Sequence, residues 1–288
     1  MEKVKKLSGK LVLGSVFFLV SLFFITSVNA DSLQSDVALN IERADERQID
    51  SYLIRNGLTR EEVSKLDIET KKLTIEDFKD ILAENPQEKL IFREEEKKKY
   101  FKNSNGQLEE ITEVDDSHFY LQSTIPEEDL ALWFGSIGTS HSDIYRIYAN
   151  FEWKKAETAP REFIGFAKET DLDIAPDSYE ARIQYKTSSG SSWYYYGDAG
   201  GRPYEIDSNN GATWNWSGPA YYYKGFVSYR IVKDSSDTSA IFEMEYASDY
   251  NSTTTSVSAN LGPITVNHKL SDGSSMLKAP HRQTVYFN

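Results

Sequence analysis

The chain contains no cysteine among its 288 residues. Disulfide bonds, structural zinc sites built on thiolates and catalysis by a thiol nucleophile are therefore excluded. Stability has to come from the burial of apolar side chains instead. The length is sufficient for two modest domains, each with a core of its own.

The residue patterns of common enzyme classes are also missing. The sequence has no G-x-S-x-G elbow, no Walker loop and no dinucleotide-binding fingerprint. The four histidines are His118, His141, His268 and His281. They form neither an H-E-x-x-H pattern nor any other i, i+4 pair, so a zinc hydrolase has no visible ligand set. We interpret His268, which shares a predicted strand face with Ile264 and Val266, as a sheet residue rather than a base. These absences favour a protein without catalytic activity.

The long apolar run of the sequence lies at the N-terminus. Residues 11–25 are apolar, follow a segment with four lysines, and precede Val28-Asn29-Ala30. This is the organisation of a secretory signal peptide with a small-x-small cleavage site, and we expect residues 1–30 to be removed. A membrane anchor is the alternative, but no positively charged stop-transfer segment follows Ala30. Together with the lack of cysteine, the pattern favours a protein secreted by a Gram-positive bacterium.

Positive charge is scarce. The chain has 32 Lys and Arg residues against 45 Asp and Glu residues, a net charge of −13, and most of the excess lies between residues 31 and 130. The electrostatic field of this net negative charge repels polyanions, so we expect neither nucleic acid nor anionic lipid as a partner. We also expect no membrane contact beyond the signal peptide. An extracellular glycan or protein remains as the expected partner.

The acidic N-terminal region, residues 31–135, shows the periodicity of short amphipathic helices. Thr59 and Glu62 have the spacing of a capping box, and Thr74 with Asp77 repeats the arrangement. We therefore expect one helix to begin after each of these threonines. The apolar stripes are thin, so the helices need a partner surface to be stable.

The same region contains signals for a hairpin and for one more turn of helix. Asn105-Gly106 lies between two runs with apolar residues and predicts a β-hairpin. Pro126 predicts a helical turn that carries Leu130, Trp133 and Phe134 onto the following domain.

Over residues 143–288 the hydrophobic period changes from about 3.6 to 2. In "YRIYANFEW", Ile147 and Phe151 share one face and Asn150 lies on the other. Similar short runs recur to the C-terminus between clusters of Gly, Pro, Asn, Asp and Ser. The sequence thus predicts an α+β chain, in which a small helical N-terminal region precedes an antiparallel β-sandwich at 143–288, with a boundary near 136–142. A closed barrel is the second choice.

Residues 191–223 hold three Trp and seven Tyr residues. Successive rings of a strand point to opposite faces, so a one-sided core accounts for only half of them. Either all the rings form a core with hydrogen-bonded hydroxyls, or some form a surface that stacks on sugars or fills the pockets of a protein partner. We expect Trp153 to be buried and at least two rings of the stretch to be exposed in one concave patch. The predicted ligand-binding residues are Trp193, Tyr195, Tyr204, Trp214, Trp216 and Tyr222.

Two alternatives to a binding protein stay open. A secreted glycan hydrolase needs only two suitably spaced carboxylates, and a pore-forming protein could use the alternating hydroxyl residues of "TTTSVSAN" at 253–260, although these include few apolar residues. Asp171 and Asp173 could also hold a calcium ion, but they match no complete calcium loop; no other cofactor is expected. The candidate catalytic carboxylates are Asp171, Asp173, Asp177, Asp198, Glu205 and Asp207.

The order of these signals resembles a group of secreted proteins of Gram-positive bacteria. The resemblance is carried by "NGLTREEVSKLDIETKK", "YFKNSNGQLEEITE", "YANFEWKK" and "SANLGPITVNHK", and it spans most of the chain after residue 30. It implies export and the same two-part architecture. The group has no agreed activity, so it supplies no catalytic residues.

Overall fold

The structure is a computed structural model. It describes residues 39–111, 128–157, 159, 161–169, 172–196, 203, 205–207, 210–217, 221–234, 236–249, 259–261, 264–266 and 276–287. The chain divides into two compact units, Met1–Ile49 and Asp50–Asn288. The sheets and the sites discussed below belong to the second unit. The predicted signal peptide and His268 lie outside the described residues.

Three helices occupy the first part of the described chain: α2 (Glu46–Arg55), α3 (Arg60–Lys65) and α4 (Ile68–Glu84). The capping box predicted at Thr59 is confirmed, because its side chain accepts from the amide of Glu62 while the Glu62 carboxylate accepts from the amide of Thr59. The second predicted box is wrong. Asp67 already caps α4 by accepting from two amides, and Thr74 lies inside that helix with its hydroxyl donating to the Thr70 carbonyl at 2.7 Å.

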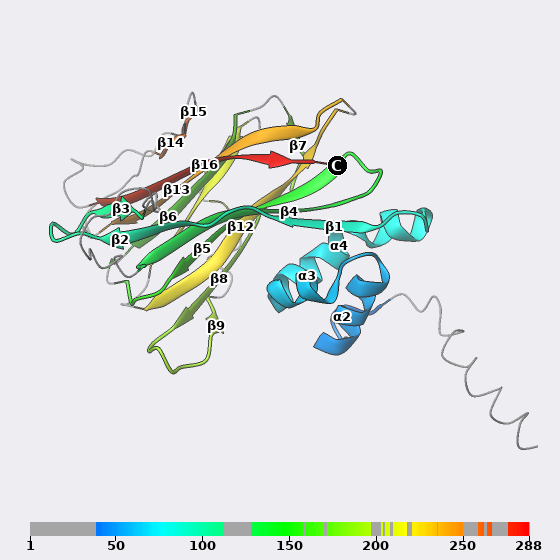
Figure 1. Cartoon of the computed structure of the whole chain (residues 1–288), viewed down its shortest axis with the longest axis horizontal. Coiled ribbons are helices and arrows are strands. Elements are labelled where there is room, and N and C mark those ends of the chain that lie inside the picture. The colour runs from blue at the N-terminus through cyan, green and yellow to red at the C-terminus, as the bar shows by residue number, and fades with distance from the viewer. Residues whose placement is uncertain are drawn as a thin grey trace, which may run out of the picture. The chain divides into compact units, whose positions relative to one another are not determined.

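The strands form two large antiparallel sheets, which Figure 1 shows with their labels. The larger sheet has the order β3-β2-β4-β5-β12-β8-β9, with β1 on β4 and β7 on β12. Its strands are β1 (Leu90–Glu94), β2 (Lys98–Lys102), β3 (Leu108–Glu110), β4 (Leu130–Thr139), β5 (Ile144–Trp153), β7 (Asp173–Ile174), β8 (Glu180–Lys186), β9 (Tyr194–Tyr195) and β12 (Tyr222–Val232).

The smaller sheet has the order β10-β11-β6-β13-β16. Its strands are β6 (Arg161–Lys168), β10 (Glu205–Asp207), β11 (Gly211–Ser217), β13 (Ser239–Asp249) and β16 (Met276–Tyr286). A separate pair consists of β14 (Ala259–Leu261) and β15 (Ile264–Val266). The two large sheets are not closed into a barrel. The predicted fold class, a helical N-terminal region followed by an antiparallel β-sandwich, is confirmed.

The sequence locates the β2–β3 hairpin correctly but not the strand that follows it. Gly106, in the predicted turn, has φ of 77° and connects β2 to β3. In contrast, Leu130, Trp133 and Phe134 lie in β4 and not in a helical turn. Strand β4 pairs with β5 from Leu130 to Gly138, so strands from both sides of the predicted boundary share one sheet.

The core lies between the two sheets. Alternate residues of β5 point into it, and Trp153 is buried beside Ile147 and Phe151 as predicted. Rings from opposite sheets are in contact, such as Phe166 and Tyr229 with centroids 4.3 Å apart. Burial of this apolar surface supplies the stability that a chain without disulfides requires. Among the described residues, no helix is both long and apolar enough to cross a membrane.

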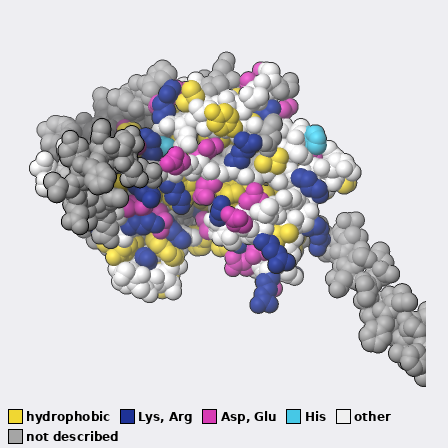
Figure 2. All heavy atoms as spheres, in the orientation of Figure 1, with side chains coloured by type: hydrophobic (Ala, Val, Ile, Leu, Met, Phe, Trp, Pro, Cys, Tyr) yellow, Lys and Arg dark blue, Asp and Glu magenta, His cyan; other side chains and the backbone are white. Residues whose placement is uncertain are grey.

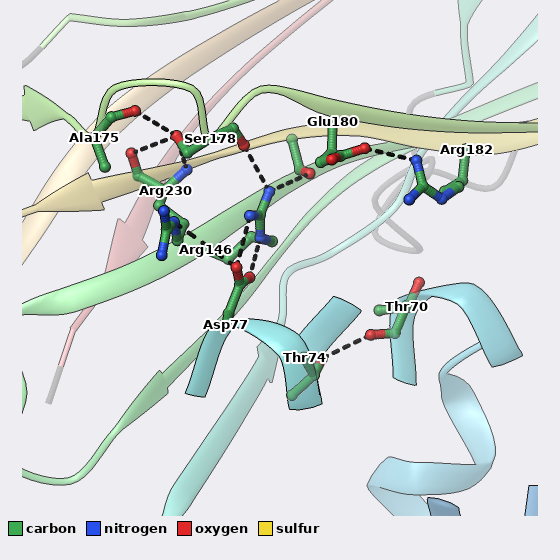
Figure 3. A network of polar contacts seen from close by, with 10 residues as sticks. Thr70, Thr74, Asp77, Arg146, Ala175, Ser178, Glu180, Arg182 and Arg230 are labelled. Atoms are coloured by element: carbon green, nitrogen blue, oxygen red, sulfur yellow. Dashed lines mark hydrogen bonds and ion pairs between the residues drawn. The ribbon is translucent and has the colours of Figure 1, made fainter. Parts of the chain in front are cut away.

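The opposite face of the larger sheet, called the outer face below, is held to helix α4 by a buried ion pair. The guanidinium of Arg146 on β5 contacts both carboxylate oxygens of Asp77 on α4 (Figure 3). It also donates to the Ser178 carbonyl at 2.9 Å and to the Ser228 hydroxyl at 3.0 Å. These contacts compensate for removing the charge from water. Asp77, read from the sequence as a helix cap, therefore anchors the helix to the sheet.

Candidate functional site

Two of the predicted ligand-binding residues lie in the core. Trp214 and Trp216 of β11 are 0% and 2% exposed, and Trp216 stacks on Phe151 of the larger sheet at 5.3 Å. The two tryptophans share one face of β11, and that face is covered by the larger sheet. The expectation of an exposed ring is therefore corrected for both, and a ligand cannot reach them in this structure.

Three other predicted residues lie on the outer face of the larger sheet or at its margin. Tyr195 is 44% exposed, while Trp193 and Tyr222 are half-buried. Tyr195 accepts a hydrogen bond of 2.9 Å from the Gln184 side chain, and Gln184 is an outer-face residue of β8. Tyr204 lies outside the described residues.

A groove of about 310 Å³ opens on the same face, between the α3–α4 connection and the larger sheet. Its lining contains acidic and basic side chains, the amide side chains of Asn150 and Gln184, and aromatic rings. The groove is therefore more polar than the mostly apolar pockets that bind small hydrophobic molecules. Figure 2 likewise shows acidic and basic side chains interleaved on the side it presents. The lining residues are Lys65, Leu66, Asp67, Thr70, Phe92, Glu94, Lys97, Trp133, Gly135, Tyr148, Asn150, Phe151, Glu152, Gln184, Lys224 and Gly225.

The aromatic floor of the groove is the Trp133 ring on β4. The ammonium group of Lys97 lies 4.0 Å from its centroid, at cation–π distance. The Asn150 side chain donates to the backbone carbonyl of Trp133 at 3.4 Å, which ties this amide to β4 within the groove lining. Lys97 is exposed and can leave the ring at little cost. The ring face then becomes available for stacking.

The groove and the predicted aromatic residues meet at Gln184 and Lys224. Both residues line the groove and are direct partners in the β8–β12 ladder. Gln184 donates to Tyr195, and the Lys224 ammonium lies 4.6 Å from the Trp193 ring centroid. Burial, followed by the negative charges of Asp67 and Glu69, raises the pKa of Tyr195 to about 12. The hydroxyl of Tyr195 therefore stays protonated at neutral pH and can donate to a ligand.

The backbone of the groove depends on one glycine. Gly225 of β12 has φ of 155°, and a Cβ atom there would lie 2.1 Å from the Arg182 carbonyl oxygen. Any other residue would displace β12 from β8. The glycine thus preserves the pairing of β12 with β8 beneath the groove.

Of the candidate catalytic carboxylates, Asp173 and Asp177 are the two whose side chains the structure describes. Asp173 is exposed on β7, and Asp177 has a left-handed φ of 53° typical of a turn. Asp171 and Asp198 lie outside the described residues, and β10 contains Glu205 and Asp207. For calcium, no group of three or more His, Asp or Glu residues able to hold a metal ion occurs in the described part of the chain.

A different pair of carboxyl groups lies in the interior. Glu162 is 0% exposed, and burial, followed by the charge of Glu157, raises its pKa well above the usual value. It accepts from the Ser248 hydroxyl at 2.7 Å. Glu157 forms an ion pair of 2.8 Å with Lys102. A substrate cannot reach either group, so this pair belongs to the packing of the sandwich.

Sequence reasoning missed most of the groove. The sequence predicts a helical turn at Trp133, and the spacing of residues in α3 and α4 does not show that these helices lie beside β4 and β5. One signal was present: Asn150 and Glu152 share the face of β5 opposite to its apolar residues. A polar face on a central strand indicates that this face lies outside the core and is open to solvent or a ligand.

No family model and no curated protein sequence matches the chain. Among solved structures, the collagen-binding subdomain ACE19 of the Enterococcus faecalis surface protein ACE is 9% identical with a TM-score of 0.32, and the match covers 51% of this chain and 90% of that chain. The collagen-binding domain of a Staphylococcus aureus adhesin is 9% identical with a TM-score of 0.31, covering 50% and 88%.

The NetB toxin of Clostridium perfringens, in its membrane-inserted form, is 10% identical with a TM-score of 0.30; the match covers 69% of this chain and 97% of that chain. At TM-scores near 0.3 these likenesses carry no inference about ligand or activity.

Proposed function

We propose that this chain is an extracellular, non-enzymatic binding protein whose ligand occupies the groove on the outer face of the larger sheet. The observation that carries the proposal is that Trp133 lines the groove on the same face of the sheet on which Trp193 and Tyr195 adjoin it through Lys224 and Gln184. Flat rings beside amide groups suit a polar ligand with one apolar face, such as a sugar. A glycan is therefore the ligand class we favour over a protein.

The groove supports binding better than hydrolysis. A glycosidase needs two carboxyl groups that face the scissile bond. The Asp67 carboxylate accepts from the amides of Glu69 and Thr70 as the cap of α4, and the Glu152 carboxylate binds Lys154 at 2.5 Å. Glu94 is the remaining carboxylate of the lining, and one is not enough. For pore formation, residues 253–258 of the candidate segment lie outside the described residues, and no observation favours it.

The test is binding to a glycan array and to isolated cell walls by the wild-type chain and by a Trp133→Ala variant. We expect the variant to lose at least about fivefold in affinity, taking the about 1–3 kcal/mol that a flat nucleobase gains by stacking on one aromatic side chain as the scale. Tyr286→Ala is the matched control, because Tyr286 is a ring 53% exposed on β16 of the smaller sheet.

Equal binding by wild type and the Trp133 variant, with both proteins folded by circular dichroism, would contradict the groove as the site. Turnover of a bound glycan by the wild-type chain would instead support the hydrolase alternative.

A further inference from the structure

Two lysines with like charge lie side by side at the edge of the groove. In the β8–β12 ladder Lys186 is opposite Tyr222 and Lys224 is opposite Gln184, so the two lysines are diagonal neighbours on the outer face. Like charges at such positions repel each other. The arrangement costs free energy unless a negative group is nearby.

Within the described part of the chain, neither lysine has a carboxylate partner. Glu152 is directly opposite Lys224 in the β5–β12 ladder, but its carboxylate binds Lys154 at 2.5 Å. Lys186 donates to the Ser189 carbonyl at 3.3 Å, which leaves its charge uncompensated.

Some other lysines of the same unit are paired: Lys71 contacts Asp50 at 2.7 Å, and Lys233 contacts Asp143 at 3.2 Å. Lys186 and Lys224 differ from these in lying next to each other without an ion pair to a carboxylate among the described residues, an arrangement that suits an external anion.

Aromatic rings lie against the two ammonium groups. Lys186 lies 4.7 Å and Lys224 4.6 Å from the centroid of Trp193, and Lys186 also lies 5.0 Å from the centroid of Tyr222. These weak cation–π contacts favour this placement of the two lysines, and an anion can exchange for them. Trp193, Tyr222, Lys186 and Lys224 together are called the rim cluster.

We infer that the rim cluster binds the carboxylate of an acidic glycan, whose neutral part lies in the groove against Trp133. This inference rests on the proposed function and specifies its ligand. The two ammonium groups bind the anion, and the adjoining Gln184 amide can hydrogen-bond hydroxyl groups of the sugar.

An acidic peptide is less suitable than a glycan for this face. Peptides commonly bind sheets by adding a strand at a free edge. The two central strands under the groove have no free edge, because β5 is paired with β4 and β12, and β12 is paired with β5 and β8. Recognition at these strands has to come from their side chains. This favours a ligand that is bound through its ring faces and hydroxyl groups.

The experiment compares oligogalacturonate with its methyl ester, which keeps the sugar backbone and removes the charge, together with hyaluronan fragments and neutral glucans. Binding is measured by titration calorimetry at low and high salt. We expect the acid form to bind at least about tenfold more tightly than the ester, since two charge-assisted contacts are lost. Lys186→Gln with Lys224→Gln should abolish this preference, whereas the control Lys79→Gln with Lys89→Gln, at exposed positions outside the groove, should retain it.

The possible failures are distinguishable. If neutral and acidic glycans bind equally and only Trp133→Ala weakens binding, the rim cluster inference is overturned and the proposed function stands. If no acidic glycan binds, the inference is overturned as well. If polyglutamate binds in a lysine-dependent manner and no glycan does, the anion site is real but the glycan assignment of both proposals is wrong.

Discussion

The inner and outer faces of the larger sheet are made from alternate residues of the same strands, yet they are covered differently. The inner face meets the smaller sheet in a continuous core that includes Trp214 and Trp216. The outer face is divided between a part where Asp77 of α4 binds Arg146 and a part that remains open as the groove. The inner face is therefore specified by packing, while the outer face carries the charged and polar groups that recognition requires.

The aromatic residues of the two faces illustrate the difference. Trp216 is enclosed by rings of both sheets, with Phe151 at 5.3 Å and Tyr246 at 5.9 Å. Trp193 instead has two lysine ammonium groups over its ring. Because Trp216 and Trp193 are the same residue type, their identity alone does not distinguish their roles. Their surroundings place Trp216 in the core, and we propose that Trp193 contacts the ligand.

The largest expected effect comes from removing an inner ring. Trp214→Ala should lower the free energy of unfolding by about 3–5 kcal/mol, because it leaves a cavity in the core. Trp193→Ala on the outer face should cost less than about 1 kcal/mol. Urea denaturation followed by circular dichroism measures both, and similar losses for the two variants would remove the distinction between the faces.

The ion pair under helix α4 should have the next largest effect. Asp77→Ala leaves the buried Arg146 charge with neutral partners only, and we expect a loss of about 3 kcal/mol. Asp80→Ala, an exposed position on the same helix, is the control. The double variant Asp77→Ala, Arg146→Met should recover part of the loss in the same denaturation measurement; a double variant less stable than Asp77→Ala would contradict this account.

An inner histidine makes the core sensitive to acid. Burial, followed by the charge of Lys98, lowers the pKa of His281 to about 4, and the imidazole stacks on Phe134 at 5.0 Å. The unfolded chain therefore binds a proton more readily, so the contribution of His281 to stability is present above pH 6.5 and is lost as the pH falls through 4. We expect about 2 kcal/mol less stability at pH 4.5 than at pH 7 from this residue. His281→Phe should reduce the difference between melting temperatures at these two pH values, and an unchanged difference would refute the assignment.

The smallest effects concern single hydroxyl groups. Tyr195 on the outer face accepts from Gln184 at 2.9 Å, so Tyr195→Phe should cost up to about 1 kcal/mol. The Tyr229 hydroxyl in the core has no hydrogen-bond partner among the described residues. Tyr229→Phe should therefore be neutral or slightly stabilising. The reverse order in thermal melts would show that the polar bonds of the outer face contribute nothing.

Local sequence patterns predict those parts of the fold that depend on residues close together in the sequence. The capping box at Thr59, the Asn105-Gly106 turn and the alternation around Ile147 predicted α3, the β2–β3 hairpin and β5. The start of α4 was misplaced because Thr74 and Asp77 have the spacing of a cap but serve other partners.

Tertiary pairing could not be read from the same patterns. The alternation of side chains along a strand shows that Trp214 and Trp216 share a face of β11. It does not show which face of β11 packs against the other sheet. Leu130 to Gly138 became a strand through its pairing with β5. The groove combines α3, α4 and five strands that are far apart in sequence, so no spacing within a single segment could reveal it.

Strand β12 has consequences for how this protein can vary. Tyr229 packs in the core, Ser228 accepts from Arg146, Gly225 preserves the backbone at the groove and Lys224 belongs to the rim cluster. A strand with one face in solvent tolerates substitution at every second position. Strand β12 has no such free positions along this stretch, so saturation mutagenesis should show a continuous run of intolerant sites there. Changes in ligand preference would therefore have to arise in the groove walls at α3, β1 and the segment before β9, where substitutions leave the core intact.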